Sequence, residues 1–105
     1  DPQYFEAARA LAQRAMREAD STPEAAAEFM FRLCTARPTR PDEMAELMGL
    51  YRDHLQQFQA DPDAARRLLA VGELPPEEGL DPAQSAAWTI VANTVLNLDE
   101  VLTKN

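Results

Sequence analysis

Apolar residues recur at helical spacing along most of the chain, and the most extensive pattern is the last one, at about 81–102. Its apolar positions form one wide stripe: Trp88, Val91, Val95, Leu98 and Leu102. A narrow polar strip is expected on the opposite side: Thr89, Asn93, Asn97, Glu100 and Lys104. Because so wide an apolar face needs neighbours on most sides, we expect this C-terminal helix to be central. Trp88, the only tryptophan, is the expected anchor of the core.

Four earlier stretches show the same period and predict helices at about 2–19, 23–36, 40–60 and 62–71. The first two helices are expected to turn inward the residues Phe5, Ala8, Leu11, Ala12, Ala15, Met16, Ala26, Phe29, Met30, Leu33 and Cys34. The next two are expected to turn inward Met44, Leu47, Met48, Tyr51, Leu55, Phe58, Ala65, Leu68 and Leu69. The polar face of the first helix comprises Glu6, Arg9, Gln13, Arg14 and Arg17. Phe31 falls off the second stripe, so we expect it to touch another helix or a partner.

Proline marks the expected helix starts. Four prolines, at positions 2, 23, 62 and 82, directly follow a residue suited to capping: Asp1, Thr22, Asp61 and Asp81. An Asp or Thr side chain accepts a hydrogen bond from the first helical turn, and proline at the next position lacks only a donor that would be unpaired anyway. Around the fifth proline, Thr39 and Asp42 have the spacing of a capping box.

These features predict an all-α fold, a compact bundle of about five helices that forms one domain over residues 1–105. The alternative is an α-solenoid of repeated helix pairs, because helix starts recur about every twenty residues. No matching side chains align between the helix pairs, which favours the bundle. Residues 72–80, rich in proline and glutamate, are expected to form the one long loop.

Charge and composition narrow the classes of function. The chain is 46% hydrophobic and has a net charge of −8. It lacks the dense basic face that nucleic-acid binders and basic membrane-surface helices need. No apolar run approaches the roughly 20 residues of a membrane span. The chain begins with Asp1 rather than methionine, so we expect it to be a fragment of a larger protein.

The residues most often used in catalysis are scarce. Cys34 is the only cysteine, which excludes an intrachain disulfide and a covalently attached c-type haem. Its place near a helix C-terminus disfavours a thiolate, so we expect a small core residue. His54 is the only histidine, and without a second His or Cys we expect it to flank solvent. We therefore expect no catalytic, cofactor-binding or metal-binding residue in this chain.

Two polar features leave alternatives open. The loop at 72–81 carries Glu73, Glu77, Glu78 and Asp81, which are either solvated or hold a cation, although the calcium-loop pattern is missing. The candidate interaction strip consists of Thr89, Asn93, Asn97 and Glu100. Asparagine is a poor helix former, so two of them one turn apart indicate amides with specific partners. The alternative is that the strip is only the solvent face of its helix.

The tail of the chain carries Ala87-Trp88-Thr89, Ala92-Asn93 and Leu96-Asn97-Leu98-Asp99-Glu100. With parts of 1–10, 31–39 and 61–72, these residues resemble the C-terminal part of a planctomycete-type domain of unknown function. That domain closes large secreted bacterial proteins, which often carry a planctomycete-type cytochrome c domain. The resemblance implies an extracytoplasmic or periplasmic location, with redox chemistry elsewhere in the parent protein. It implies no catalytic residue at any position of this chain.

Three functional hypotheses follow. The leading one is a non-catalytic packing or interaction module that closes a larger extracytoplasmic protein, with the other domains of that protein as partners. The second is an accessory part of an enzyme, possibly redox-linked, which adds a wall or lid to an active site built by other domains. The third is a helical peptide-binding module. An exposed apolar groove favours the third, and a cleft with converging carboxylates favours the second.

Overall fold

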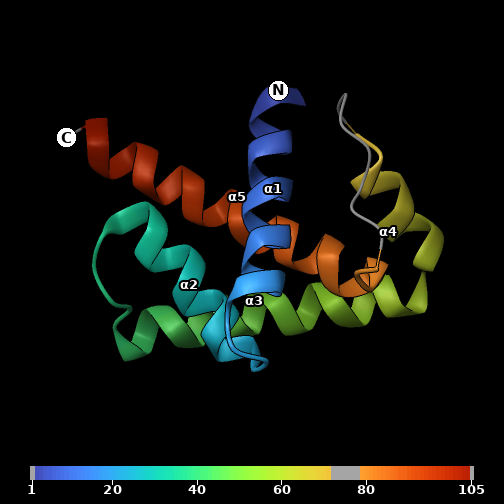
Figure 1. Cartoon of the computed structure of the whole chain (residues 1–105), viewed down its shortest axis with the longest axis horizontal. Coiled ribbons are helices and arrows are strands. Elements are labelled where there is room, and N and C mark those ends of the chain that lie inside the picture. Colours follow the sequence, from blue (N-terminus) through green and yellow to red (C-terminus); the bar gives the residue numbers. More distant parts are fainter. Residues whose placement is uncertain (1, 72–78, 105) are drawn as a thin grey trace.

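The computed structural model describes the backbone of residues 2–71 and 79–104 and the side chains of residues 5–71 and 79–98. This part of the chain contains α helices and no strand, so the predicted all-α fold is confirmed (Figure 1). The helices are α1 (Pro2–Glu18), α2 (Pro23–Thr35), α3 (Pro41–Ala60), α4 (Pro62–Leu69) and α5 (Pro82–Lys104). Each begins within about a residue of its predicted start.

Helix α5 is central, as predicted, because each of the other four helices packs against it. Figure 1 shows α5 crossing the molecule behind α1, with α3 along one side and with α2 and α4 at opposite ends. Helices α1 and α5, which pack against each other, both carry fully buried small residues, including Ala8 and Ala12 on α1 and Ala86 and Ala87 on α5. Small side chains let two helices approach closely. The radius of gyration, 13.0 Å, matches the roughly 13 Å of a compact domain of this length and does not suit an extended solenoid.

Three of the predicted caps are confirmed. Thr22 Oγ1 accepts a hydrogen bond from the Ala25 N–H at 3.1 Å, and Asp61 Oδ1 accepts one from Ala64 at 3.2 Å. Asp81 Oδ2 accepts one from the Gln84 N–H at 2.9 Å. Each cap satisfies a backbone donor that the first helical turn leaves unpaired. The fourth predicted cap, Asp1, lies outside the described residues.

The predicted capping box at Thr39 is wrong by one residue. Helix α3 begins after Arg40, whose N–H donates to Glu43 Oε1 at 2.8 Å. Thr39 bonds instead to Glu28 of α2, through its hydroxyl to Oε1 at 2.6 Å and through its N–H to Oε2 at 3.1 Å. A carboxylate from the neighbouring helix accepts both Thr39 donors, so the threonine ties α2 to the start of α3 instead of capping α3.

The predicted polar face of α1 is partly wrong, because Arg9 is only 2% exposed and Gln13 only 8%. Arg9 reaches the end of α4, where its guanidinium donates to the carbonyl oxygens of Leu69 and, at 3.4 Å, Val71. The last carbonyls of a helix lack partners within the helix, and a cation is favoured near that end. This arginine therefore joins the middle of α1 to the end of α4 from inside the fold.

Helix α2 and the second half of α5 are also turned differently from the prediction. Phe31 is buried in the core, which agrees with the expectation that it touches another helix, whereas Leu33, which was expected inside, is 50% exposed. Because α2 contacts α1, α3 and α5, its buried face is centred on Ala27, Met30 and Phe31 and excludes Leu33. On α5, Leu98 is 45% exposed, although the apolar stripe predicts it inside.

Candidate functional site

The predicted interaction strip on α5 does not form one surface. Thr89 is fully buried, and its hydroxyl donates to the Ser85 carbonyl oxygen at 2.7 Å. A threonine can satisfy its hydroxyl on the carbonyl four residues earlier, so it needs no external partner and can occupy an enclosed helix face. Thr89 is therefore wrong as an interaction residue. Asn93 is half-buried and Asn97 exposed, while the side chain of Glu100 lies outside the described residues.

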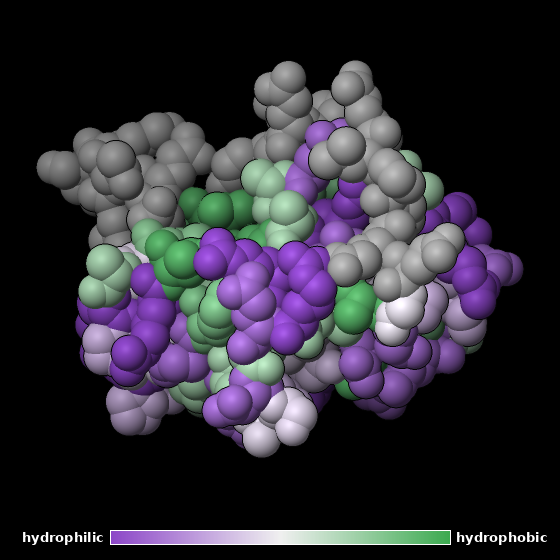
Figure 2. All heavy atoms as spheres, viewed as in Figure 1, coloured by the Kyte–Doolittle hydropathy of each residue, from purple (hydrophilic) through white to green (hydrophobic). Residues whose placement is uncertain are grey.

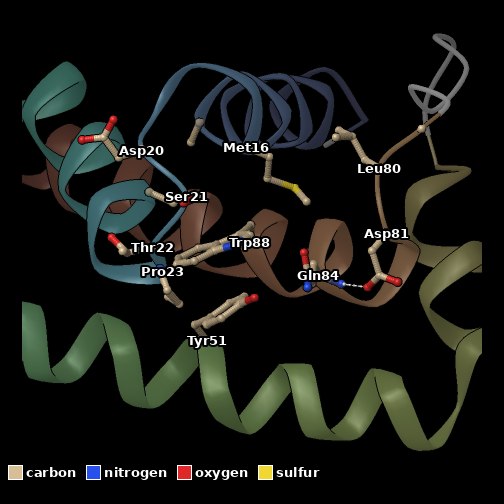
Figure 3. A pocket seen from close by; sticks show the side chains of 13 residues that line it. Met16, Asp20, Ser21, Thr22, Pro23, Tyr51, Leu80, Asp81, Gln84 and Trp88 are labelled. Carbon is tan, nitrogen blue, oxygen red and sulfur yellow. Dashed lines mark hydrogen bonds between the residues drawn. The ribbon is translucent and has the colours of Figure 1, made fainter.

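Trp88 lies in the core, as predicted, with only 3% of its surface exposed. Its indole stacks on the ring of Tyr51 from α3, with the ring centroids 3.7 Å apart and the planes 13° from parallel. No local sequence pattern pairs these two aromatic residues, which lie far apart in the chain. The stack joins the middle of α3 to the first half of α5 (Figure 3).

A cavity of about 350 Å³ opens beside the Tyr51–Trp88 stack, and we call it the aromatic cavity. It lies between the end of α1, the α1–α2 turn, the middle of α3 and the start of α5 (Figure 3). The residues that line it are Ala15, Met16, Asp20, Ser21, Thr22, Pro23, Ala26, Tyr51, Gly79, Leu80, Asp81, Gln84 and Trp88. No local sequence pattern brings these residues together, because they come from four separate segments.

The charged side chains that line the aromatic cavity are both carboxylates, Asp20 and Asp81. Figure 3 shows them at opposite ends of the cavity, with the Gln84 side chain and the Tyr51 hydroxyl nearer to Asp81. Burial raises the pKa of the Tyr51 hydroxyl, and the negative charge of Asp81 raises it further, while a hydrogen bond with Trp88 acts in the opposite direction. The Tyr51 phenol is therefore neutral at physiological pH.

A second hollow, of about 440 Å³, lies where α2, α3 and the second half of α5 meet, and we call it the α3–α5 groove. The residues that line it are Phe31, Arg40, Asp42, Glu43, Glu46, Leu47, Leu50, Thr94 and Leu98. Its floor is apolar and its rim charged. Figure 2 shows one face of the molecule, mostly polar, with apolar residues gathered between α2 and the second half of α5.

A network of ion pairs beside the groove holds the α2–α3 connection. Arg37 donates to both carboxylate oxygens of Glu43, at 2.9 and 2.8 Å, and its guanidinium lies 4.8 Å from the centre of the Phe31 ring. The bond from Arg37 and the backbone bond from Arg40 lower the pKa of Glu43 to about 2. Burial opposes ionisation of Glu28, but bonds from Thr39 and Arg32 outweigh it and lower the pKa. Both carboxylates are therefore ionised and hydrogen-bonded at neutral pH.

The only histidine and the only cysteine are both half-buried. The His54 ring lies 6.3 Å from that of Phe58 on the same helix, and Cys34 packs against the hydrophobic core. Among the described side chains, no group of three or more His, Cys, Asp or Glu residues is arranged to hold a metal ion. The predicted cation alternative for the loop depends on Glu73, Glu77 and Glu78, which lie outside the described residues.

No protein-family model, curated protein or solved structure matches this chain. The resemblance to the planctomycete-type domain therefore rests on the residues of the sequence alone. In the described part of the chain, none of the helices has the length and apolar character needed to span a membrane.

Proposed function

We propose that this chain is a non-catalytic helical interaction module that closes a larger extracytoplasmic protein, and that it docks on another domain of that protein through the α3–α5 groove. The observation that carries the proposal is the exposure of Leu98 at 45% on a stripe whose earlier members, Trp88, Val91 and Val95, are buried. The apolar stripe of α5 thus continues past the part of the helix that the other helices bury. An apolar groove with a charged rim is the anatomy of a protein contact surface.

The composition of the groove supports a protein partner. Phe31, Leu47 and Leu50 lie on its floor, and Leu98 and Thr94 form the α5 wall. On the same helix, Asn97 comes three positions after Thr94 and therefore lies about 60° around the helix axis from this wall residue, whereas Asn93 lies about 100° from it. A partner that fills the groove would meet the Asn97 amide at its margin, so the proposal keeps an interaction role for Asn97 but gives none to Asn93.

The state of the carboxylates supports a non-catalytic role. A general acid or base needs a pKa near the working pH. The pKa values of Glu43 and Glu28 are lowered, which moves them away from neutral pH. Both carboxylates also accept hydrogen bonds, Glu43 from Arg37 and Arg40 and Glu28 from Thr39. In the aromatic cavity Asp20 and Asp81 stand at opposite ends, so they do not converge as the accessory-enzyme alternative requires.

The test is binding of the isolated chain to the remainder of the parent protein. Leu98→Asp places a charge in the apolar wall of the groove, so we expect the dissociation constant to rise at least about tenfold, equivalent to about 1.4 kcal/mol. The urea midpoint of the isolated chain should stay unchanged, since the side chain is half-exposed.

Leu33→Asp is the matched control, because Leu33 is exposed to a similar degree, 50%, and lies outside the groove. It should bind like the unchanged chain. If Leu98→Asp also binds normally, the groove is not the docking surface. If a set of unrelated amphipathic peptides binds the groove as tightly as the remainder of the parent, the chain is a peptide-binding module instead.

A further inference from the structure

The aromatic cavity lies apart from the α3–α5 groove and shares no lining residue with it. We propose that it is a binding site for a small organic amine in its protonated form, with the ammonium group at the Asp81 end and the apolar body against Met16 and Leu80. This site is independent of the docking role proposed above.

The size and construction of the cavity suit a small ligand. Its volume of about 350 Å³ falls at the lower end of the roughly 300–1,000 Å³ of small-molecule sites. Two of its walls begin at capped helix ends, since Thr22 and Asp81 each bond the first turn of their helix. The Tyr51–Trp88 stack supports the floor from the core. The cavity is therefore largely preformed.

The charge of the lining favours a cation over an anion. The lining contains two carboxylates and no lysine or arginine. The N-termini of α2 and α5 also reach the cavity, and free helix N-termini attract anions. Here the N–H groups of Ala25 and Gln84 are already bonded by the Thr22 and Asp81 side chains. At α5 the bonding group is itself a carboxylate, so an incoming anion would meet negative charge.

The acceptors at one end match an ammonium group in kind and number. An –NH₃⁺ group has three donors and no acceptor. Asp81 offers a carboxylate, Gln84 an amide oxygen and Tyr51 a phenol oxygen, and Figure 3 shows Asp81 at one end of the cavity, Gln84 next to it, and the Tyr51 hydroxyl directed toward that side from below Trp88. The neutral state of Tyr51 leaves its oxygen able to accept without adding a second charge. Met16 projects into the space above Trp88, where it can contact the apolar part of the ligand (Figure 3).

The experiment compares three probes with the same cyclohexyl body: cyclohexylmethylamine, cyclohexylmethanol and cyclohexanecarboxylate. Binding is followed by the fluorescence of Trp88, the only tryptophan, and by heteronuclear NMR shifts. We expect a saturable response to the amine, at least about tenfold weaker binding of the alcohol because it lacks the charge-assisted hydrogen bonds, and none to the carboxylate. Raised salt should weaken the binding of the amine.

Asp81→Asn is the decisive variant, because asparagine caps a helix as well as aspartate and removes only the charge. It should weaken binding of the amine at least about tenfold while the urea midpoint stays unchanged. Asp53→Asn is the matched control, since Asp53 is exposed on α3 and does not line the cavity. Tyr51→Phe should weaken binding less, through loss of one acceptor.

Three results would each overturn the proposal: no saturable response to the amine, equal binding of the alcohol, or unchanged binding by Asp81→Asn. The Leu98→Asp variant separates the two proposals, because it alters the groove only. It should bind the amine normally, whether or not it still docks on the parent protein.

Discussion

Trp88 and Arg9 are both almost completely buried, at 3% and 2% exposure, for different reasons. The indole is apolar and large, and it completes the core by stacking on Tyr51. The guanidinium is charged, and it is retained inside because the carbonyl oxygens at the end of α4 accept its hydrogen bonds. Removal of the Trp88 side chain therefore tests how much apolar burial stabilises the fold, and removal of the Arg9 side chain tests how much its buried hydrogen bonds do.

Trp88→Ala should lower the free energy of unfolding by about 3–5 kcal/mol, because it leaves a cavity and strips Tyr51 of its stacking partner. That is a large share of the roughly 5–15 kcal/mol that stabilises a small domain. Urea denaturation followed by circular dichroism measures the change. Leu33→Ala, at a position 50% exposed, should change the midpoint little. An unchanged midpoint for Trp88→Ala would contradict its role as the core anchor.

Arg9→Met keeps much of the side-chain volume but removes the donors to Leu69 and Val71. Leaving buried carbonyl oxygens unpaired should lower the free energy of unfolding by about 1–3 kcal/mol. Arg66→Met is the control, because the ion pair that Arg66 forms with Asp63 is exposed, and such pairs contribute about 0–1 kcal/mol. Equal urea midpoints for the two variants would show that Arg9 does not stabilise the end of α4.

At the scale of elements, charged side chains from both helices hold the α2–α3 connection. Thr39 is bonded by Glu28, and Arg37 and Arg40 are bonded by Glu43. Arg37 also covers the ring of Phe31, so the same ion pair shields a core residue. These contacts join residues that are close in the sequence, and they fix where α3 starts relative to α2.

The pH dependence of stability tests this connection. The pKa of Glu43 is about 2 in the fold, below its ordinary value of 4.5, so the unfolded chain takes up the proton first as pH falls. Its contribution to stability is therefore present above about pH 4.5 and is lost between about pH 4.5 and 2. In Glu43→Gln, glutamine keeps an acceptor at this helical position but not the charge.

We expect the urea midpoint of the unchanged chain to fall more steeply than that of Glu43→Gln across this range of pH, and the two to differ most near neutral pH. Asp53→Asn, at an exposed position on the same helix, serves as the charge-matched control. Midpoints of Glu43→Gln and the unchanged chain that run in parallel with pH would contradict a stabilising role for the Glu43 charge.

At the scale of the whole molecule, α5 is the surface on which the other helices meet. Helices α1 to α4 contact one another along the chain, but each also packs on α5. Isolated short helices are marginally stable in water, so they depend on such packing. Because α5 is central, we expect cooperative folding to depend on the C-terminal quarter of the sequence.

A chain that ends at residue 78 should consequently show no cooperative transition in urea, because the apolar faces of α1 to α4 lose their common partner. Adding a peptide of residues 79–105 should restore helical circular dichroism at peptide concentrations where the peptide alone is unstructured. A peptide of the same composition in scrambled order is the control. Cooperative unfolding of the chain 1–78 by itself would show that α5 is not required.

Much of the architecture was open to prediction because its determinants are local. Helical spacing, the prolines and the caps at Thr22, Asp61 and Asp81 depend on groups within about four residues of one another. The wide apolar stripe on 81–102 is also a local pattern, and it predicts that this helix is central. These features specify which segments are helical and which face of each is largely apolar.

The sites depended on contacts that the local pattern does not contain. Arg9 is buried because a carbonyl group 60 positions away accepts its hydrogen bond, and the period of α1 alone places it outside. Thr89 looks like a surface residue by its polarity, yet its own helix satisfies its hydroxyl. Both proposed binding sites are built from several segments, so their shape and charge exist only once the helices pack. The sequence by itself determined the helices and their apolar faces, whereas tertiary packing decided which polar groups found partners inside and which apolar groups stayed uncovered.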